Sequence, residues 1–182
     1  MEQLKKLEEV MQPDNRNTHY VIINTEVGKE KNLDFEDWYR DIALIELSNG
    51  IPEEIKSQFN IAKNLAIYTW FCYPFHQISE MKAFSTVEYA LRGKYNCHVK
   101  FGEKSNINFR QLLEKAVKEG ILMDSGFTHL NKEPGQKDNG WVKEMPDLMC
   151  EFRNDLAHGS NTLNDSSWLH LRICADLINQ LF

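Results

Sequence analysis

The sequence lacks the short motifs that identify several large classes of protein. Its four cysteines show no C-x-x-C pair of the kind found in zinc sites and redox centres. It also contains neither the G-x-x-x-x-G-K-[ST] loop nor the G-x-G-x-x-G turn by which many proteins hold phosphates. We therefore expect neither a metal ion nor a cofactor.

Positive charge is also in short supply. The chain has 21 lysine and arginine residues against 27 aspartate and glutamate residues, which gives a formal net charge of −6. Proteins that coat nucleic acid without sequence preference depend on basic side chains that neutralise phosphates. Any contact with RNA must therefore be local.

No part of the sequence is apolar for long enough to suggest a membrane span. The longest candidate, residues 64–79, is uncharged but contains asparagine, threonine, proline, histidine and glutamine. Residues 1–12 are charged and amphipathic, unlike a signal peptide. We expect a soluble, cytoplasmic protein with reduced thiols and no membrane partner.

What the sequence does contain is the composition of a globular protein. Hydrophobic residues make up 42% of its 182 residues and charged residues 26%. This length suits one sizeable core rather than two independent ones. We predict a helical bundle over residues 51–182, with residues 1–50 as an N-terminal extension packed on it.

Apolar residues recur at helical spacing along most of the chain, which predicts an all-α fold. The extension is predicted to begin with a helix over residues 1–11, whose apolar stripe is Leu4, Leu7 and either Val10 or Met11. It is also predicted to contain a short strand or an ordered loop at residues 20–23. Further helices are predicted from Asp34 to about residue 48, and over residues 52–73, 75–92, 109–119, 146–158 and 165–182. The last is apolar over a wide arc that includes Trp168, which indicates a central position or a subunit interface.

One segment concentrates groups that suit RNA chemistry, the sequence FRNDLAHG at residues 152–159. Asn154 and His158 are four residues apart and share a helix face, and Arg153 is long enough to reach the same place. The negative end of a helix favours a protonated imidazole. Arginine can bind the non-bridging phosphate oxygens while histidine moves a proton, so the trio suits attack by the 2′-hydroxyl of RNA, with Asn154 orienting the phosphate or the ring.

Glu88 is a second candidate because it falls inside an apolar stripe. At 100° per residue it lies between Phe84 and Met81 on the predicted helix 75–92. A carboxylate in such a place needs a partner. A local ion pair with Arg92, one helical turn later, is one possibility and a partner elsewhere in the fold is another.

These motifs resemble those of the HEPN superfamily. Its mark is R-x(4–6)-H with a polar residue after the arginine, which Arg153, Asn154 and His158 match, and the Glu-x-x-Leu-Arg sequence from Glu88 to Arg92 resembles an upstream element of several bacterial members. Residues 109–122 resemble their middle segment, so the likeness covers residues 52–182.

The resemblance implies an up-and-down bundle that forms a homodimer, with both R-x-x-x-x-H motifs lining one cleft. It also implies a metal-independent endoribonuclease, acting in phage defence or in a toxin–antitoxin system with a defence or antitoxin partner. Arg153, Asn154 and His158 would be catalytic, and Glu88 would steady the arginine and the histidine.

The sequence departs from one subclass of the family, and other readings of the motif stay open. Ser160 stands where toxins controlled by modification carry a tyrosine, which argues against that control. Arg153 and His158 also suit simple helix capping, with the arginine paired to Glu151 or Asp155. A non-catalytic interaction or adaptor module is the alternative function, and a bundle that holds a small phosphate ligand is a third.

Overall fold

A computed structural model describes residues 3–24, 28–98, 107–130, 139–158 and 165–182. Over these residues the chain is mostly helical, as predicted. The elements are the strands β1 (Val21–Asn24) and β2 (Lys29–Asn32) and the helices α1 (Phe35–Ala43), α2 (Glu53–Tyr68), α3 (Phe75–Lys94), α4 (Phe109–Lys118), α5 (Gly140–Ala157) and α6 (Ser167–Leu181). Short 3-10 turns lie at Leu7–Glu9, Asn17–His19, Asp124–Gly126 and Thr128–Leu130.

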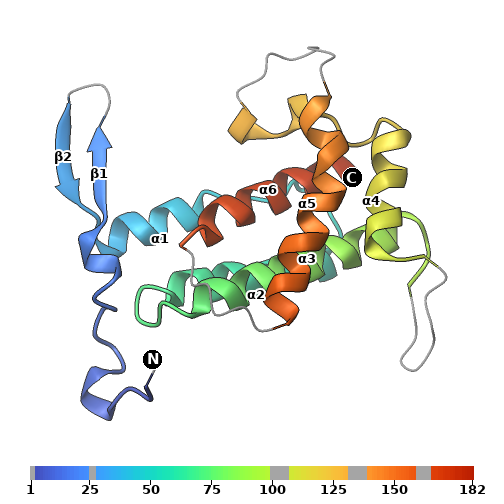
Figure 1. Cartoon of the computed structure of the whole chain (residues 1–182). Coiled ribbons are helices and arrows are strands. Elements are labelled where there is room, and N and C mark those ends of the chain that lie inside the picture. Colours follow the sequence, from blue (N-terminus) through green and yellow to red (C-terminus); the bar gives the residue numbers. More distant parts are fainter. Residues whose placement is uncertain (1–2, 25–27, 99–106, 131–138, 159–164) are drawn as a thin grey trace.

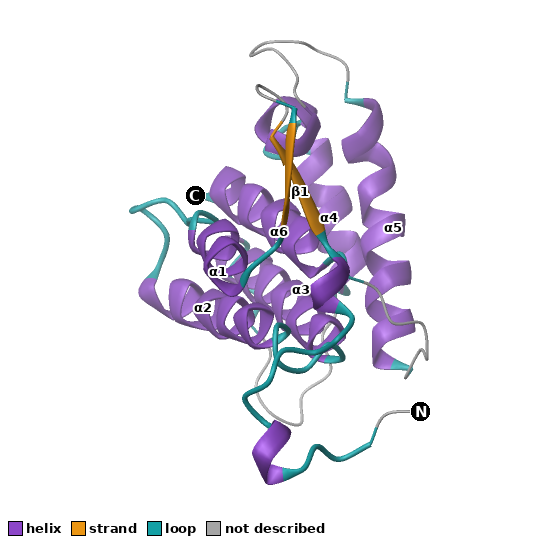
Figure 2. Cartoon of the chain, turned by 90° about the vertical axis from the view of Figure 1, so that its left-hand side faces the viewer, coloured by secondary structure: helices purple, strands orange, loops and turns teal. Residues whose placement is uncertain are grey.

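Helix α3 is the centre of the fold, because it contacts α2, α4, α5 and α6. Helices α2 and α3 run side by side and α6 packs over them, whereas α5 crosses α3 and α6 steeply (Figure 1). Seen from the side, α1 and α2 lie at one edge of the molecule and α4 and α5 at the other (Figure 2). The end of α5 that carries the R-x-x-x-x-H motif is thereby brought to the central helix.

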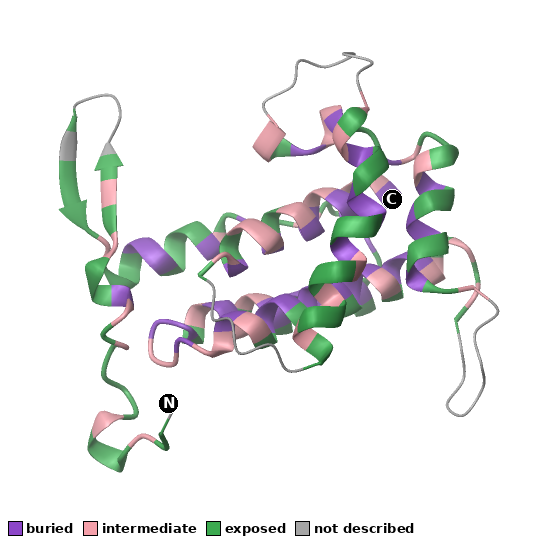
Figure 3. Cartoon of the chain, viewed as in Figure 1, coloured by how far each residue is buried: buried purple, intermediate pink, exposed green. Residues whose placement is uncertain are grey.

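The core is formed by large apolar side chains from all six helices. Phe59 of α2, Phe84 and Leu91 of α3, and Leu112 of α4 are almost fully buried, as are Leu171 and Ile178 of α6. Full burial of a side chain of this size contributes roughly 1.5–3 kcal/mol of stability. Burial is concentrated on the faces that the helices turn toward one another (Figure 3).

Helix α1 belongs to the same core although it lies before residue 50. Trp38 and Ile42 are buried with the bundle residues, and the indole Nε1 of Trp38 donates a hydrogen bond to the Ala66 carbonyl at 2.9 Å. Asp34, where the helix was predicted to begin, caps it, since its carboxylate accepts from the Asp37 amide at 2.8 Å. The division of the chain at residue 50 stays a prediction.

Most of the segment predicted as a strand or an ordered loop, residues 20–23, belongs to the strand β1, Val21–Asn24. Strand β1 pairs antiparallel with β2, with Val21 opposite Asn32 and Ile23 opposite Glu30. Two strands alone have marginal stability in water. Here Leu33, just after β2, packs against the core and anchors the end of the hairpin nearest α1.

The predicted helix at residues 1–11 is wrong over the residues that the structure describes. Only the 3-10 turn Leu7–Glu9 forms, and the side chains of Leu4 and Leu7 are 99% and 91% exposed. An isolated helix of this length is marginal unless its apolar face is buried. The periodic leucines find no surface to pack on, so the pattern produces no helix.

Two further predictions from the sequence were wrong, the start of α5 and the burial of some apolar side chains. Helix α5 begins at Gly140 and contains Pro146 within it, whereas Pro146 was predicted as its first turn. Trp168, predicted to be buried, is 41% exposed, and Ile78 and Met81 of α3 are exposed as well. The buried face of α3, centred on Ala83, Val87 and Ala90, lies on the opposite side of the helix from Ile78 and Met81. Among the described residues, no helix is both long and apolar enough to cross a membrane.

Candidate functional site

The candidate site is organised by the carboxylate of Glu88, which holds two arginines. Its Oε1 accepts from Arg92 Nη2 at 2.7 Å and from Arg92 Nε at 3.2 Å. Its Oε2 lies 2.8 Å from Nη2 of Arg153 on α5. Both partners foreseen for Glu88, the local one and the distant one, are therefore present together.

Burial differs among the three side chains, and this decides what each can do. Arg92 and Glu88 are 13% and 17% exposed, whereas Arg153 is 40% exposed. The Arg92 guanidinium also donates to the carbonyls of Cys97 and Ile107, each at 3.4 Å. Arg92 is thus enclosed. Arg153 is partly exposed at the surface, and its Nη2 is held by the ion pair with Glu88.

Helix α4 supplies a further contact to Arg153. The Cζ atom of Arg153 lies 5.5 Å from the centroid of the Phe109 ring, a cation–π distance. Phe109 is itself buried as the first residue of α4, whose N-cap Asn108 accepts from the Gln111 amide at 2.9 Å. The side chain of Arg153 is therefore fixed by α3 on one side and by α4 on another.

A third arginine, Arg110, also contacts α5. Arg110 of α4 pairs with Asp147 of α5, and burial raises the pKa of the neighbouring Cys150 thiol even though Arg110 and Arg153 oppose the rise. A raised pKa keeps the thiol protonated, so Cys150 is not a reactive thiolate. The two carboxylates of Glu88 and Asp147 thus pair with three arginines, Arg92, Arg110 and Arg153.

Asn154 and His158 lie at the same helix end but are not joined to Arg153. His158 is the C-cap of α5, its backbone amide donates to the Asn154 carbonyl at 2.9 Å, and both side chains are exposed. Among the described residues, no hydrogen bond links the three side chains. The guanidinium of Arg153 is instead paired with Glu88, and the gathering of all three side chains around a phosphate stays a prediction. Gly159 and Ser160 lie outside the described residues.

The structure also shows a charged pair that sequence reasoning missed. Glu80 of α3 is almost completely buried, and its Oε1 lies 2.9 Å from Nδ1 of His170 on α6. The His170 ring packs between Phe84 and Phe152, with ring centroids 5.8 Å and 5.3 Å away. Glu80, Phe84 and Glu88 recur every four residues, so they share one face of α3, and that spacing was the available signal.

The comparisons with known proteins add no relative. No protein-family model, no curated protein and no solved structure matches the chain. Within the described part of the chain, no group of three or more histidine, cysteine, aspartate or glutamate side chains is arranged to hold a metal ion. A function must therefore be argued from the geometry around Glu88 and from the motif itself.

Proposed function

We propose that the protein is a HEPN-type endoribonuclease that cuts RNA without a metal ion. The observation that carries the proposal is the ion pair of Arg153 with Glu88, which joins the motif at the end of α5 to the acidic residue of the Glu-x-x-Leu-Arg sequence in α3. A functional link between these two motifs was expected from the resemblance alone. A simple capping role for Arg153 would have favoured Glu151 or Asp155 on its own helix.

The geometry supports phosphate binding by Arg153. A guanidinium presents five donors in a planar fork, and Glu88 occupies only one edge of it. The part of Arg153 that remains exposed can donate to the non-bridging oxygens of a phosphodiester. Since two contacts already restrict the side chain, little conformational freedom is lost when the phosphate binds.

The proposed reaction is an internal transesterification. The 2′-hydroxyl of the RNA attacks the neighbouring phosphorus, the bond from phosphorus to the 5′-oxygen breaks, and the products are a 2′,3′-cyclic phosphate and a 5′-hydroxyl. One base takes the proton of the 2′-hydroxyl and one acid gives a proton to the 5′-oxygen. His158 performs one of these transfers, Asn154 orients the phosphate, and Arg153 stabilises the charge that builds on the phosphate oxygens.

A homodimer is the second part of the proposal, because one chain presents only one imidazole to the phosphate. An apolar groove of about 280 Å³ lies between α5 and α6, and Leu148 and Phe152 on its rim are 40% and 47% exposed. Phe152 directly precedes Arg153, so a second copy seated on this groove would lie next to the motif. Pairing there buries apolar area and brings two copies of His158 toward one RNA strand.

Cleavage assays in EDTA test the enzyme proposal. The full chain should cut single-stranded RNA, and Arg153→Ala should lower the rate by roughly a hundredfold or more, as the loss of a charge-stabilising donor does in other enzymes. Arg40→Ala, at an exposed arginine of α1, is the matched control and should cut at the wild-type rate. Equal rates for Arg153→Ala and the wild type would overturn the proposal.

The same groove supports the alternative function, a non-catalytic helical interaction module. Exposed apolar side chains on two adjacent helices are typical of surfaces that bind another protein. In that case the chain forms its complex through Leu148 and Phe152, and RNA is not cut by the wild type at any protein concentration. A role in phage defence or in a toxin–antitoxin system, with a matching partner protein, is proposed for either function on the resemblance to HEPN proteins.

A further inference from the structure

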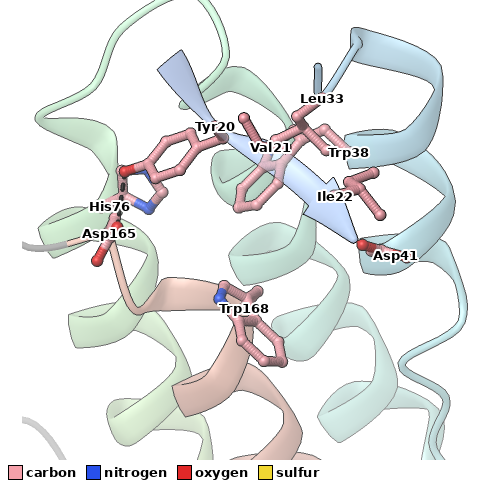
Figure 4. Close-up of a pocket in the computed structure, with 9 residues that line it drawn as sticks. All are labelled: Tyr20, Val21, Ile22, Leu33, Trp38, Asp41, His76, Asp165 and Trp168. Carbon is pink, nitrogen blue, oxygen red and sulfur yellow. Dashed lines mark hydrogen bonds between the residues drawn. The ribbon is translucent and has the colours of Figure 1, made fainter. Parts of the chain in front are cut away.

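A second pocket lies where the hairpin, α1, α3 and the start of α6 meet (Figure 4). Its volume is about 260 Å³, and its walls include the aromatic side chains of Tyr20, Trp38 and Trp168. None of these residues takes part in the Glu88 site. The pocket therefore calls for a function of its own.

Both charged residues that line the pocket are acidic. They are Asp41 and Asp165, and no lysine or arginine lines it among the described residues. Arg16 also acts electrostatically on His76 from outside the lining, and its guanidinium is paired with Asp14. Figure 4 shows Asp165 beside Tyr20 and His76 at one end of the pocket and Asp41 at the opposite end. A phosphate or carboxylate ligand is disfavoured by two carboxylates, whereas a cation is attracted both by them and by the faces of the aromatic rings.

Tyr20 strengthens the negative end of the pocket. Its hydroxyl donates to Oδ2 of Asp165 at 2.7 Å. Burial raises the pKa of Tyr20 well above its usual value, and the hydrogen bonds to Tyr73 and Asp165 act in the same direction. The phenol therefore stays protonated and remains a donor, which holds Asp165 in place as a charged acceptor.

His76 offers an unused hydrogen-bonding atom. The residue is only 1% exposed, and its Nδ1 lies 2.7 Å from the Ser167 hydroxyl oxygen. Its Nε2 has no hydrogen-bond partner within the described structure. In the tautomer that donates from Nδ1 to Ser167, Nε2 keeps a lone pair that can accept an N–H. A buried polar atom without a partner destabilises the fold, and a ligand N–H that reaches Nε2 removes that penalty.

From this arrangement we propose that the pocket binds a small aliphatic diamine in its doubly protonated form. One ammonium group lies near Asp165 and His76, the other lies near Asp41, and the methylene chain between them packs on Trp38 and Trp168. Aromatic walls with acidic ends fit both parts of such a molecule. Binding at this pocket does not depend on cleavage of RNA at the Glu88 site.

Calorimetric titration of the full chain tests this assignment with two matched probes. Putrescine carries an ammonium group at each end of a four-carbon chain, and butanediol has the same chain with neutral hydroxyl ends. Putrescine should bind and butanediol should not, because only the charged ends interact with the carboxylates. Equal heats of binding for the two probes, or no binding of putrescine at millimolar concentration, would overturn the proposal.

Two variants locate the binding in the pocket. Asp41→Asn removes one charge at an exposed position and should weaken putrescine binding by roughly tenfold, and Trp168→Ala should weaken it to a similar extent by removing an aromatic wall. Asp155→Asn, at an exposed aspartate of α5, is the control and should bind as the wild type does. Putrescine binding that is unchanged in both pocket variants would show that the diamine lies elsewhere and would overturn the assignment.

Discussion

Nη2 of Arg153 lies 2.8 Å from Oε2 of Glu88, although the two residues belong to different helices that cross near the centre of the fold. Because Oε1 of the same carboxylate binds Arg92, Glu88 links the end of α5 to the last turns of α3. The Glu88 carboxylate fixes the direction of the Arg153 side chain and also supplies the counter-charge for the enclosed Arg92. Activity and stability should therefore depend on this one carboxylate in different ways.

Glu88→Gln should lower both stability and RNA cleavage. The substitution leaves the enclosed Arg92 without its counter-charge, which should cost about 1–3 kcal/mol in the free energy of unfolding, less than a fully buried pair would cost because Arg153 is partly exposed. Urea denaturation measures this loss. Glu36→Gln, which removes the exposed partner of Arg40, should change stability by well under 1 kcal/mol.

The positioning role of Glu88 is separated from its structural role by kinetics. At a temperature where Glu88→Gln remains fully folded, kcat should fall while KM for RNA changes little, because Arg153 can still meet the phosphate but no longer in a fixed direction. Glu88→Asp, which keeps the charge, should recover part of the rate. A wild-type kcat in folded Glu88→Gln would contradict the positioning role.

Leu148→Glu should separate a dimer into monomers. A carboxylate on the rim of the groove between α5 and α6 would have to be desolvated when a second copy packs there. Sedimentation velocity measures the change, and RNA cleavage should fall with it if the paired motifs form one cleft. Leu44→Glu is the control, since Leu44 at the end of α1 is also an exposed leucine and lies away from that groove. A monomeric wild type would rule out this interface.

Stability should fall in mild acid because of His76. Burial lowers the pKa of His76 from 6.5 to about 4, and the nearby Asp165 and Asp14 only partly oppose this shift. Between these two values the unfolded chain binds a proton that the folded chain does not, so the stability present above pH 6.5 is lost as the pH falls toward 4. The loss should be about 3 kcal/mol over the whole window.

Urea denaturation of His76→Gln between pH 7.5 and about 4.5 isolates this effect. The variant should show a flatter dependence of unfolding free energy on pH than the wild type. His19→Gln, at an exposed histidine just before the hairpin, should keep the wild-type slope. Identical slopes for wild type and His76→Gln would show that His76 does not titrate in the folded state as described.

Asp124→Asn should loosen the start of α5. The Asp124 side chain is fully buried, and its carboxylate accepts from the Val142 amide at 2.7 Å and from the Trp141 amide at 3.3 Å. An amide side chain accepts with only one oxygen and carries no charge to interact with the helix N-terminus, so about 1–2 kcal/mol should be lost. Amide hydrogen exchange in the first turn of α5 should accelerate. Asp155→Asn, at an exposed aspartate, should leave it unchanged.

The same aspartate explains where prediction from sequence failed. Asp34, a cap that lies directly before its helix, was recognised because its signal is local. Fifteen residues, 125–139, lie between Asp124 and the start of α5, so no local pattern shows that Asp124 caps Gly140–Ala157. Proline is common in the first turn of a helix, where its missing amide hydrogen costs no hydrogen bond, so Pro146 was predicted to lie there. In the structure it lies inside α5.

Periodicity predicted most helices but not which stripes would be covered. Phe84, in the apolar stripe of the predicted helix 75–92, is buried, whereas Leu4 and Leu7 show the same kind of spacing and remain exposed. The spacing of apolar residues shows which face a helix would bury. Whether another element packs on that face depends on the whole fold. The position of Glu88 in an apolar stripe predicted that it needs a partner. That Arg153 is one of its partners could not be predicted, because their contact depends on how α5 crosses α3.

End-group analysis of the RNA products, made in EDTA, tests the central claim most directly. The proposed transesterification predicts a 2′,3′-cyclic phosphate on one fragment and a 5′-hydroxyl on the other, with cleavage lost in His158→Ala and in Arg153→Ala while both variants remain folded. Fragments with a 5′-phosphate, or cleavage that persists in both variants, would contradict the account.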